Sequence, residues 1–182
     1  MNVCVYCSSS DLVDPKYLEV ARELGRLLGE RKNNLVFGGG NTGSMNALAE
    51  GVKESGGRVI SVIPTFMHMK GLTFADSDEI VETEDMQVRR ITMIKGSDVF
   101  IGLPGGLGTL EEVSENLTMR QLKLHDKPLC LVDVDGFWDP LLTFFDQIRD
   151  GGFLLGEHRD LIHSAPTPAE ALVRLDQMAA TG

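Results

Sequence analysis

The sequence predicts an α/β protein, built on a parallel sheet with helices on both of its faces. Short apolar segments of strand character alternate with segments of helical periodicity along the 182 residues. The apolar segments are nearly continuous in hydrophobic residues, which is typical of strands that are buried on both faces. Right-handed crossovers between such strands give a doubly wound, Rossmann-like arrangement.

The first half of the chain alternates strands and helices. The first helix begins at Pro15, a residue type favoured at the first helical position, and the third strand ends at Pro64. Residues 65–78 show no clear period, so we expect a loop near the ligand there. The predicted strands are 2–9, 34–40 and 58–64, and the predicted helices are 15–32 and 44–57.

The second half continues the same alternation. The predicted strands are 79–85, 98–104, 127–135 and 161–165, and the predicted helices are 86–96, 109–124, 139–151 and 167–179. No linker, repeat or low-complexity segment divides the sequence, so residues 1–182 are predicted to form one domain.

The charge balance argues against a nucleic-acid partner. The formal net charge is -10 and the sequence pI is about 4.8, whereas a protein that binds DNA or RNA presents a basic surface to the phosphates. No run of 18 apolar residues indicates a membrane span, and the N-terminus lacks the features of a secretory signal. We therefore expect a cytoplasmic protein whose partner is a small molecule bound in a pocket.

Three cysteines, Cys4, Cys7 and Cys130, are predicted to be buried thiols. The spacing of Cys4 and Cys7 also fits a zinc or redox pair, but both lie in a predicted strand, where an offset of three places them on opposite faces. No second cysteine pair would complete a zinc site, and the histidines are too scattered to replace it. The sequence thus predicts no metal and no cofactor.

Two glycine-rich segments follow predicted strands. The first, GGGNTG at 38–43, matches the dinucleotide pattern GxGxxG, but the next strand ends in proline and threonine where an acidic residue would bind the ribose. We therefore expect these glycines to let the backbone approach a ligand or helix closely, with Thr42 or Ser44 capping the helix that follows.

The second segment, PGGLGT at 104–109, indicates a phosphate site. Gly105, Gly106 and Gly108 leave the backbone amides accessible, and Thr109 adds a hydroxyl at the start of a helix, where the macrodipole favours an anion. The lysine of a nucleoside triphosphatase loop is missing, so a monophosphate held without a metal fits better.

Two carboxylates follow this loop, and their role stays open from spacing alone. Glu112 lies three residues after Thr109, as in a capping box, in which its side chain would bond to the threonine amide. Alternatively, one carboxylate faces the ligand and takes part in its chemistry. Because Glu111 and Glu112 differ by about 100° around the helix, only one is expected to face the site.

An arginine supports the second interpretation. Arg89 lies on the same predicted helical face as Met86 and Met93, where an arginine is either extended along apolar surface or attracted by an anion. Its helix leads into the strand that carries the phosphate loop. Arg89 and a glutamate around a phosphorylated sugar would make a hydrolytic site.

The two motifs together resemble those of the Lonely guy family of cytokinin riboside 5′-monophosphate phosphoribohydrolases. PGGLGTLEE is similar to the family motif PGGxGTxxE, and MQVRR at 86–90 is similar to its MxxRK segment. VCVYCSSS, VFGGGNTGSM, LHDKP and VDGFWDPLL resemble further family segments in the same order. The sequence departs from the family pattern at Arg90, where a lysine is usual, and at Gly71, where plant members often carry a glutamate.

The resemblance implies a Rossmann-like homodimer with active sites near the interface. The implied reaction hydrolyses the N-glycosidic bond of a nucleoside 5′-monophosphate to the free base and ribose 5-phosphate. It assigns catalysis to Arg89 and Glu112. The implied substrate-binding residues are Ser8, Ser9, Gly39, Gly40, Met86, Arg90, Gly105, Gly106, Gly108 and Thr109.

Two alternatives remain open at this stage. One is a general nucleosidase that cleaves AMP or GMP. The other is a carrier of the same fold that binds a nucleotide or molybdopterin-type group without turnover. The lysine decarboxylase label once given to the family conflicts with the chemistry, because the sequence shows no pattern that pairs a pyridoxal-phosphate lysine with its pyridinium partner.

Overall fold

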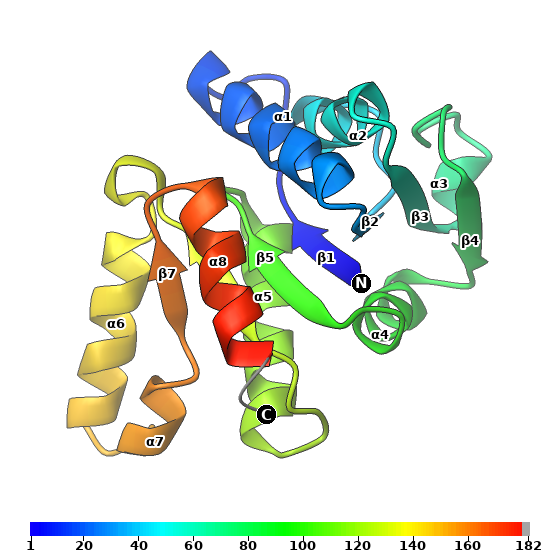
Figure 1. Ribbon diagram of the computed structural model, residues 1–182. Helices are drawn as coiled ribbons and strands as arrows, with labels where there is room; N and C mark the ends of the chain where they lie inside the picture. Colours follow the sequence, from blue (N-terminus) through cyan, green and yellow to red (C-terminus); the bar gives the residue numbers. More distant parts are fainter. Residues whose placement is uncertain (180–182) are drawn as a thin grey trace.

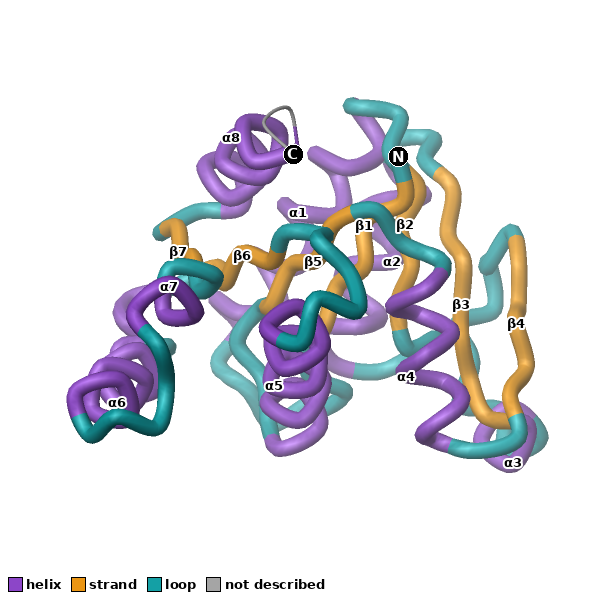
Figure 2. Tube along the Cα trace, turned by 90° about the horizontal axis from the view of Figure 1, so that it is seen from below, coloured by secondary structure: helices purple, strands orange, loops and turns teal. Residues whose placement is uncertain are grey.

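A seven-stranded parallel sheet lies at the centre of the molecule, as the alternating pattern predicts. The computed structural model describes residues 1–179 (Figure 1). The strands follow the order β4-β3-β2-β1-β5-β6-β7, which Figure 2 shows side by side from one edge to the other. Their bounds are β1 Asn2–Tyr6, β2 Asn34–Phe37, β3 Arg58–Pro64, β4 Glu79–Thr83, β5 Val99–Gly102, β6 Leu129–Val132 and β7 His163–Ala165.

Helices cover both faces of this sheet. The apolar residues of α1, α2 and α8 form one buried cluster with the sheet, and those of α4, α5 and α6 pack in a second cluster on the opposite face. Figure 2 shows α8 and α5 on opposite sides of the strands. The bounds are α1 Pro15–Glu30, α2 Gly43–Glu54, α4 Met86–Lys95, α5 Leu107–Gln121, α6 Asp139–Asp150 and α8 Pro168–Ala179.

The two cysteines of β1 and its extension illustrate the alternation of a strand. Cys4 belongs to the cluster under α4 and α5, whereas Cys7 belongs to the cluster under α1 and α2. Both are free and buried, as is Cys130, which confirms the prediction of buried thiols. Burial raises the pKa of each thiol, because a low-dielectric interior disfavours the thiolate. Among residues 1–179, no group of three or more metal-ligating side chains comes together.

Helices α1 and α2 approach each other at two glycines. A Cβ on Gly25 would lie 2.2 Å from the Leu48 carbonyl oxygen, and one on Gly51 would lie 2.3 Å from the Arg22 carbonyl oxygen. The pair therefore packs backbone against backbone, since no larger side chain fits between the helices. This contact fixes α2, which begins where the first glycine-rich segment ends.

Three short helical turns differ from the predicted pattern. The segment predicted as a loop at 65–78 contains the helix α3 Thr65–His68, and α7 Gly156–Arg159 and the 3₁₀ turn η1 Val134–Gly136 lie in segments with no helix prediction. Each spans three or four residues, which is too short to show a helical period in the sequence. Helix α5 also starts at Leu107, two residues before its predicted start at Thr109.

No helix between residues 1 and 179 is long and apolar enough to cross a bilayer. The strand order reverses between β1 and β5: β2, β3 and β4 lie on one side of β1, and β5, β6 and β7 on the other. In a doubly wound sheet, ligands bind beyond the carboxyl ends of the strands at such a point.

Candidate functional site

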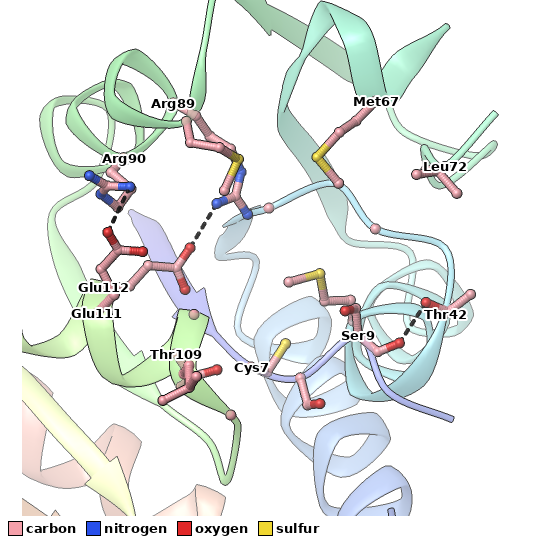
Figure 3. Close-up of a pocket in the computed structure, with 18 of the residues that line it drawn as sticks. Cys7, Ser9, Thr42, Met67, Leu72, Arg89, Arg90, Thr109, Glu111 and Glu112 are labelled. Carbon is pink, nitrogen blue, oxygen red and sulfur yellow. Dashed lines mark hydrogen bonds and ion pairs between the residues drawn. The ribbon is translucent and has the colours of Figure 1, made fainter. Parts of the chain in front are cut away.

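A cavity of about 540 Å³ opens beyond the carboxyl ends of β1, β2 and β5 (Figure 3). Its walls come from the segment after β1, the glycine-rich segment after β2, the residues after β3, helix α4, and the first turns of α5. These segments are far apart in sequence, and the reversal of strand order brings them together.

Arg89 and Glu112 form a buried ion pair in the wall of this cavity. The Arg89 Nη1 donates to Glu112 Oε1 at 2.8 Å, and only 5% and 6% of the two side chains are exposed. The Arg89 Nε donates to the Val62 carbonyl at 3.1 Å, so β3 fixes the orientation of the guanidinium. Arg89 comes from α4 and Glu112 from α5, and the structure thus joins the two residues for which catalysis is predicted.

Burial dominates the electrostatics of the Glu112 carboxyl. It raises the pKa above the ordinary value of a glutamate, and the neighbouring Arg89 charge and hydrogen bond lower the pKa by less than burial raises it. Glu112 is therefore a stronger base than an exposed glutamate, held by a cation that leaves its second oxygen, Oε2, outside the ion pair.

The first glycine of the GGGNTG segment makes room for this arginine. A Cβ on Gly38 would lie 1.7 Å from the Arg89 Nη2, well inside contact distance. In the same segment, Gly43 adopts φ +59°, and a Cβ there would meet the backbone after β1, at Ser9 and Ser10. These two glycines thus allow close approach, Gly38 to a side chain of helix α4 and Gly43 to the backbone after β1.

The N-terminus of α5 presents free amides to the cavity. The first N–H groups of a helix lack intrahelical acceptors, and in α5 these belong to Leu107, Gly108 and Thr109. The N-cap residue is Gly106, which offers no side chain to bond them. The Thr109 side chain is buried beside this turn and lines the cavity with Gly106 and Gly108. Oriented amides at a helix N-terminus bind anions, so this turn can hold a phosphate.

The capping-box interpretation of Thr109 and Glu112 is wrong. Thr109 is the third residue of α5 and not its N-cap, and the Glu112 carboxylate bonds to Arg89 instead of a backbone amide. The N-cap of α2 is Thr42, one of the two predicted candidates, but its hydroxyl donates to the Ser9 carbonyl at 2.7 Å and does not cap the helix.

The second carboxylate also reaches the cavity, which corrects the expectation that only one of the pair could. Glu111 lies at the rim, more than half exposed, where Arg90 Nη1 contacts its Oε1 at 3.2 Å. The Arg90 Nε donates to Glu115 Oε2 at 2.7 Å. Two carboxylates thus hold Arg90 at the rim, as Figure 3 shows for Glu111.

The predicted site residues come together with two exceptions. Ser8, Ser9, Gly40, Met86, Arg89, Arg90, Gly106, Gly108, Thr109 and Glu112 all line the cavity. Gly39 does not: its φ is +75°, and a Cβ there would pack against Ser61 and Ile63 of β3. Gly105 lies against the Thr109 side chain, because a Cβ added to Gly105 would lie 2.1 Å from the Thr109 hydroxyl oxygen. We therefore infer that Gly39 and Gly105 allow the backbone shape of their loops.

Sequence patterns identified the rest of the cavity wall only in part. Met45, Met67 and Leu72 form an apolar part of the cavity, together with the Cys7 thiol. Asn41 and Thr42 lie beside them. The absence of a period in 65–78 indicated a loop near the ligand but did not identify which of its side chains face the cavity.

Comparisons with known proteins identify relatives over most of the chain. Residues 45–175 match the family model described as "Possible lysine decarboxylase". The chain is 43% identical over 176 residues to the "Probable cytokinin riboside 5′-monophosphate phosphoribohydrolase LOG6" of Arabidopsis thaliana, covering 97% of this chain and 88% of that protein. It is 41% identical over 174 residues to the cytokinin riboside 5′-monophosphate phosphoribohydrolase LOG5 of the same plant, covering 96% and 76%.

Solved structures share the fold at lower sequence identity. The molybdenum cofactor carrier protein of Chlamydomonas reinhardtii superposes with a TM-score of 0.77 and 24% identity, covering 98% of both chains. This likeness supports the Rossmann-like assignment of the sheet.

Proposed function

The chain belongs to the family of the cytokinin riboside 5′-monophosphate phosphoribohydrolases, and on that basis we propose that it hydrolyses the N-glycosidic bond of a nucleoside 5′-monophosphate. The products are the free base and ribose 5-phosphate. One observation carries the proposal beyond the family name: a buried Arg89–Glu112 pair lies in the same cavity as the free amides of α5.

In the proposed complex, the α5 turn at 106–109 holds the 5′-phosphate of the substrate. The amides of the turn and the Thr109 hydroxyl supply donors, and the helix dipole favours the dianion. Arg90 lies at the rim, with its charge offset by its ion pairs to Glu111 and Glu115. The phosphate contacts are remote from the glycosidic bond, so their binding energy orients the ribose for reaction.

Glu112 is proposed to act at the anomeric carbon. As the bond from C1′ to the base nitrogen breaks, positive charge develops on the sugar, and the carboxylate stabilises it. Water then forms the new C1′–O bond and transfers a proton to Glu112, while the departing base takes up a proton from solvent. Arg89 orients the carboxylate through the 2.8 Å hydrogen bond.

The end of the cavity opposite this pair supports an apolar base substituent. Figure 3 shows Met67 and Leu72 across the cavity from Glu112 and Thr109. Methionine side chains adapt to irregular apolar groups. We therefore propose a cytokinin-type nucleotide, with an apolar group on the adenine, as the preferred substrate over unmodified AMP or GMP.

A carrier without turnover is the second candidate, since the molybdenum cofactor carrier protein shares the fold. A site that only holds an anion gains little from a buried carboxylate beside it, so the Arg89–Glu112 pair favours hydrolysis. A decarboxylase that uses pyridoxal phosphate needs a lysine to bind the cofactor, and the described residues that line the cavity include none.

The test is to incubate the purified protein with isopentenyladenosine 5′-monophosphate, AMP and GMP, and to assay free base and ribose 5-phosphate. We expect release of both products, fastest from the isopentenyl nucleotide. If AMP and GMP are cleaved as fast as the isopentenyl nucleotide, the result would support a general nucleosidase. Binding of the nucleotides without any release would support a carrier and overturn the proposal.

A homodimer is proposed as the working assembly. Three large apolar side chains are exposed along α4 and α5: Val88 in α4, Leu107 at the start of α5, and Leu122 directly after the end of α5. A second copy that covers these residues would place the cavity near the interface. Light scattering should give the mass of a dimer, and Val88→Asp should shift it to that of a monomer. A monomeric wild-type protein would contradict this assembly.

A further inference from the structure

The segment between β3 and β4 crosses the apolar end of the cavity as a strap, which we define as residues 66–74. Met67 and Leu72 of the strap line the cavity. Its middle is poorly packed, because Met69 is 82% exposed and a Cβ on Gly71 would contact nothing. The strap therefore has few apolar contacts of its own to hold its middle in place.

One end of the strap is anchored in the core. Phe74 is buried, and its ring packs edge-on against Phe37 of β2 with centroids 6.5 Å apart. Its backbone N–H donates to the Gly39 carbonyl at 2.8 Å. Two bonds within the strap hold it further, from the Leu72 N–H to the Met67 carbonyl at 3.4 Å and between His68 Nδ1 and the Thr73 hydroxyl at 2.7 Å.

Asn41 holds the middle of the strap by two hydrogen bonds. Its backbone N–H donates to the Leu72 carbonyl at 3.2 Å, and its side-chain Nδ2 donates to the Gly71 carbonyl at 2.9 Å. Gly71 has φ +71°, so the side-chain bond fixes the chain at the point where it turns. Asn41 is half-buried and itself lines the cavity.

The strap lies at the end of the cavity that the nucleobase would occupy. The cations and free amides, Arg89, Arg90 and the α5 turn, lie on the other side (Figure 3). In a nucleoside monophosphate, the base is the uncharged end, remote from the phosphate. A substituent on the base would therefore meet Met67 and Leu72.

From this geometry we infer that Asn41 is a positioning residue for substrate specificity: its side-chain amide holds the strap so that Met67 and Leu72 form the wall against the base. The inference rests on the proposed function for the identity of the substrate. It assigns to Asn41 no part in bond cleavage, because its hydrogen bonds go to the strap and not to Arg89 or Glu112.

The test compares Asn41→Ala with Asn46→Ala. Both changes remove one asparagine side-chain hydrogen bond of 2.9 Å, but that of Asn46 goes to Glu50 in α2, away from the strap. For Asn41→Ala, we expect kcat/KM for isopentenyladenosine 5′-monophosphate to fall about threefold to tenfold relative to that for AMP, mainly through KM. Asn46→Ala should leave this ratio unchanged.

A double-mutant cycle separates positioning from direct contact. If Asn41 acts by positioning Leu72, adding Asn41→Ala to Leu72→Ala should cause little further loss of discrimination between the two nucleotides. Additive effects of the two changes, or an equal loss of kcat/KM for both nucleotides, would overturn the inference, because they would indicate direct contact of Asn41 with the substrate.

Hydrogen–deuterium exchange supplies a readout that needs no substrate. Asn41→Ala should speed exchange of the strap amides, and Asn46→Ala should not. If the wild-type protein hydrolyses no nucleotide, the proposed function fails together with the specificity role, whereas the exchange still reports whether Asn41 holds the strap. If the wild-type protein is active and Asn41→Ala changes neither exchange nor the ratio of the two substrates, this inference alone fails.

Discussion

The Arg89 guanidinium and the Glu112 carboxylate meet at 2.8 Å in the wall of the cavity, although they lie on different helices and 23 residues apart. Less than a tenth of the surface of either side chain is exposed to solvent. A buried ion pair is weak evidence for stability alone, because desolvation offsets much of its attraction. Its place beside the free amides of α5 supports the proposed catalytic role, and four predictions test its consequences.

Glu112→Gln should strongly reduce turnover without unfolding the protein. The amide oxygen of glutamine can still accept from Arg89 Nη1, but it neither takes a proton nor stabilises a developing positive charge as a carboxylate does. We expect kcat to fall by about 10²-fold to 10⁴-fold. Binding of ribose 5-phosphate, measured by calorimetry, should remain. Full turnover of this variant would remove Glu112 from the mechanism.

Arg89→Met should destabilise the fold, since it leaves the Glu112 carboxylate buried and unpaired. We expect a loss of about 3–5 kcal/mol in the free energy of unfolding, measured with urea at neutral pH. The double variant Arg89→Met/Glu112→Leu should recover most of this loss. Arg58→Met is the control, because its pair with Glu79 is about half exposed and should contribute less than about 1 kcal/mol. Equal losses for the two single variants would contradict the burial argument.

The pH dependence should report the raised pKa of Glu112. If the ionised carboxylate is required, kcat/KM should fall on the acid side with a midpoint above 4.5, the ordinary value of a glutamate. A folded-state pKa above the unfolded one means that the native protein binds this proton more readily. The contribution of Glu112 to stability is therefore present below pH 4.5 and lost as pH rises towards the folded pKa.

Two titrations check this prediction. The pH profile of kcat/KM locates the acid limb. The free energy of unfolding of the wild-type protein minus that of Glu112→Gln should fall as pH rises through the same window. A difference that instead rises with pH would show that Arg89 outweighs burial.

Gly38→Ala should impair activity, although Gly38 carries no functional group. The added Cβ would lie 1.7 Å from Arg89 Nη2, so the guanidinium must move and lose its alignment with Glu112. We expect a loss of about 10²-fold in kcat, as for other small misplacements of catalytic groups. Gly156→Ala is the control, because nothing lies within 4 Å of its added Cβ. Normal kcat for Gly38→Ala would show that Arg89 is free to adjust.

Much of the fold could be predicted from the sequence, because the central strands are short and apolar, and glycine or proline lies at or next to an end of β2, β3, β5 and β6. The spacing of β1, β2 and β5 with the glycine-rich segments after β2 and β5 also indicated where the cavity lies. Hydrophobic periodicity and glycine-rich loops are local signals in the sequence. They are sufficient to locate the cavity here because the parallel sheet brings the ends of its strands together.

The orientation of single side chains could not be predicted in this way. The spacing of Thr109 and Glu112 fits a capping box as well as a catalytic site, and the choice depends on Arg89, which comes from another helix. Likewise, Met67 and Leu72 line the cavity, and the strap that carries them bonds to Asn41 and Gly39 of a distant segment. Such contacts between distant segments leave no period in the sequence.

The cavity divides cleanly along the chain. The residues proposed to meet the base precede β4, whereas the turn proposed to hold the phosphate and the Arg89–Glu112 pair follow it. Recombination between relatives at that strand would therefore exchange the proposed base wall as one inherited block, with Gly38 and Val62, which position Arg89 from that block, kept unchanged. A new base could be accepted by chimeras of natural genes without redesign of the reacting groups.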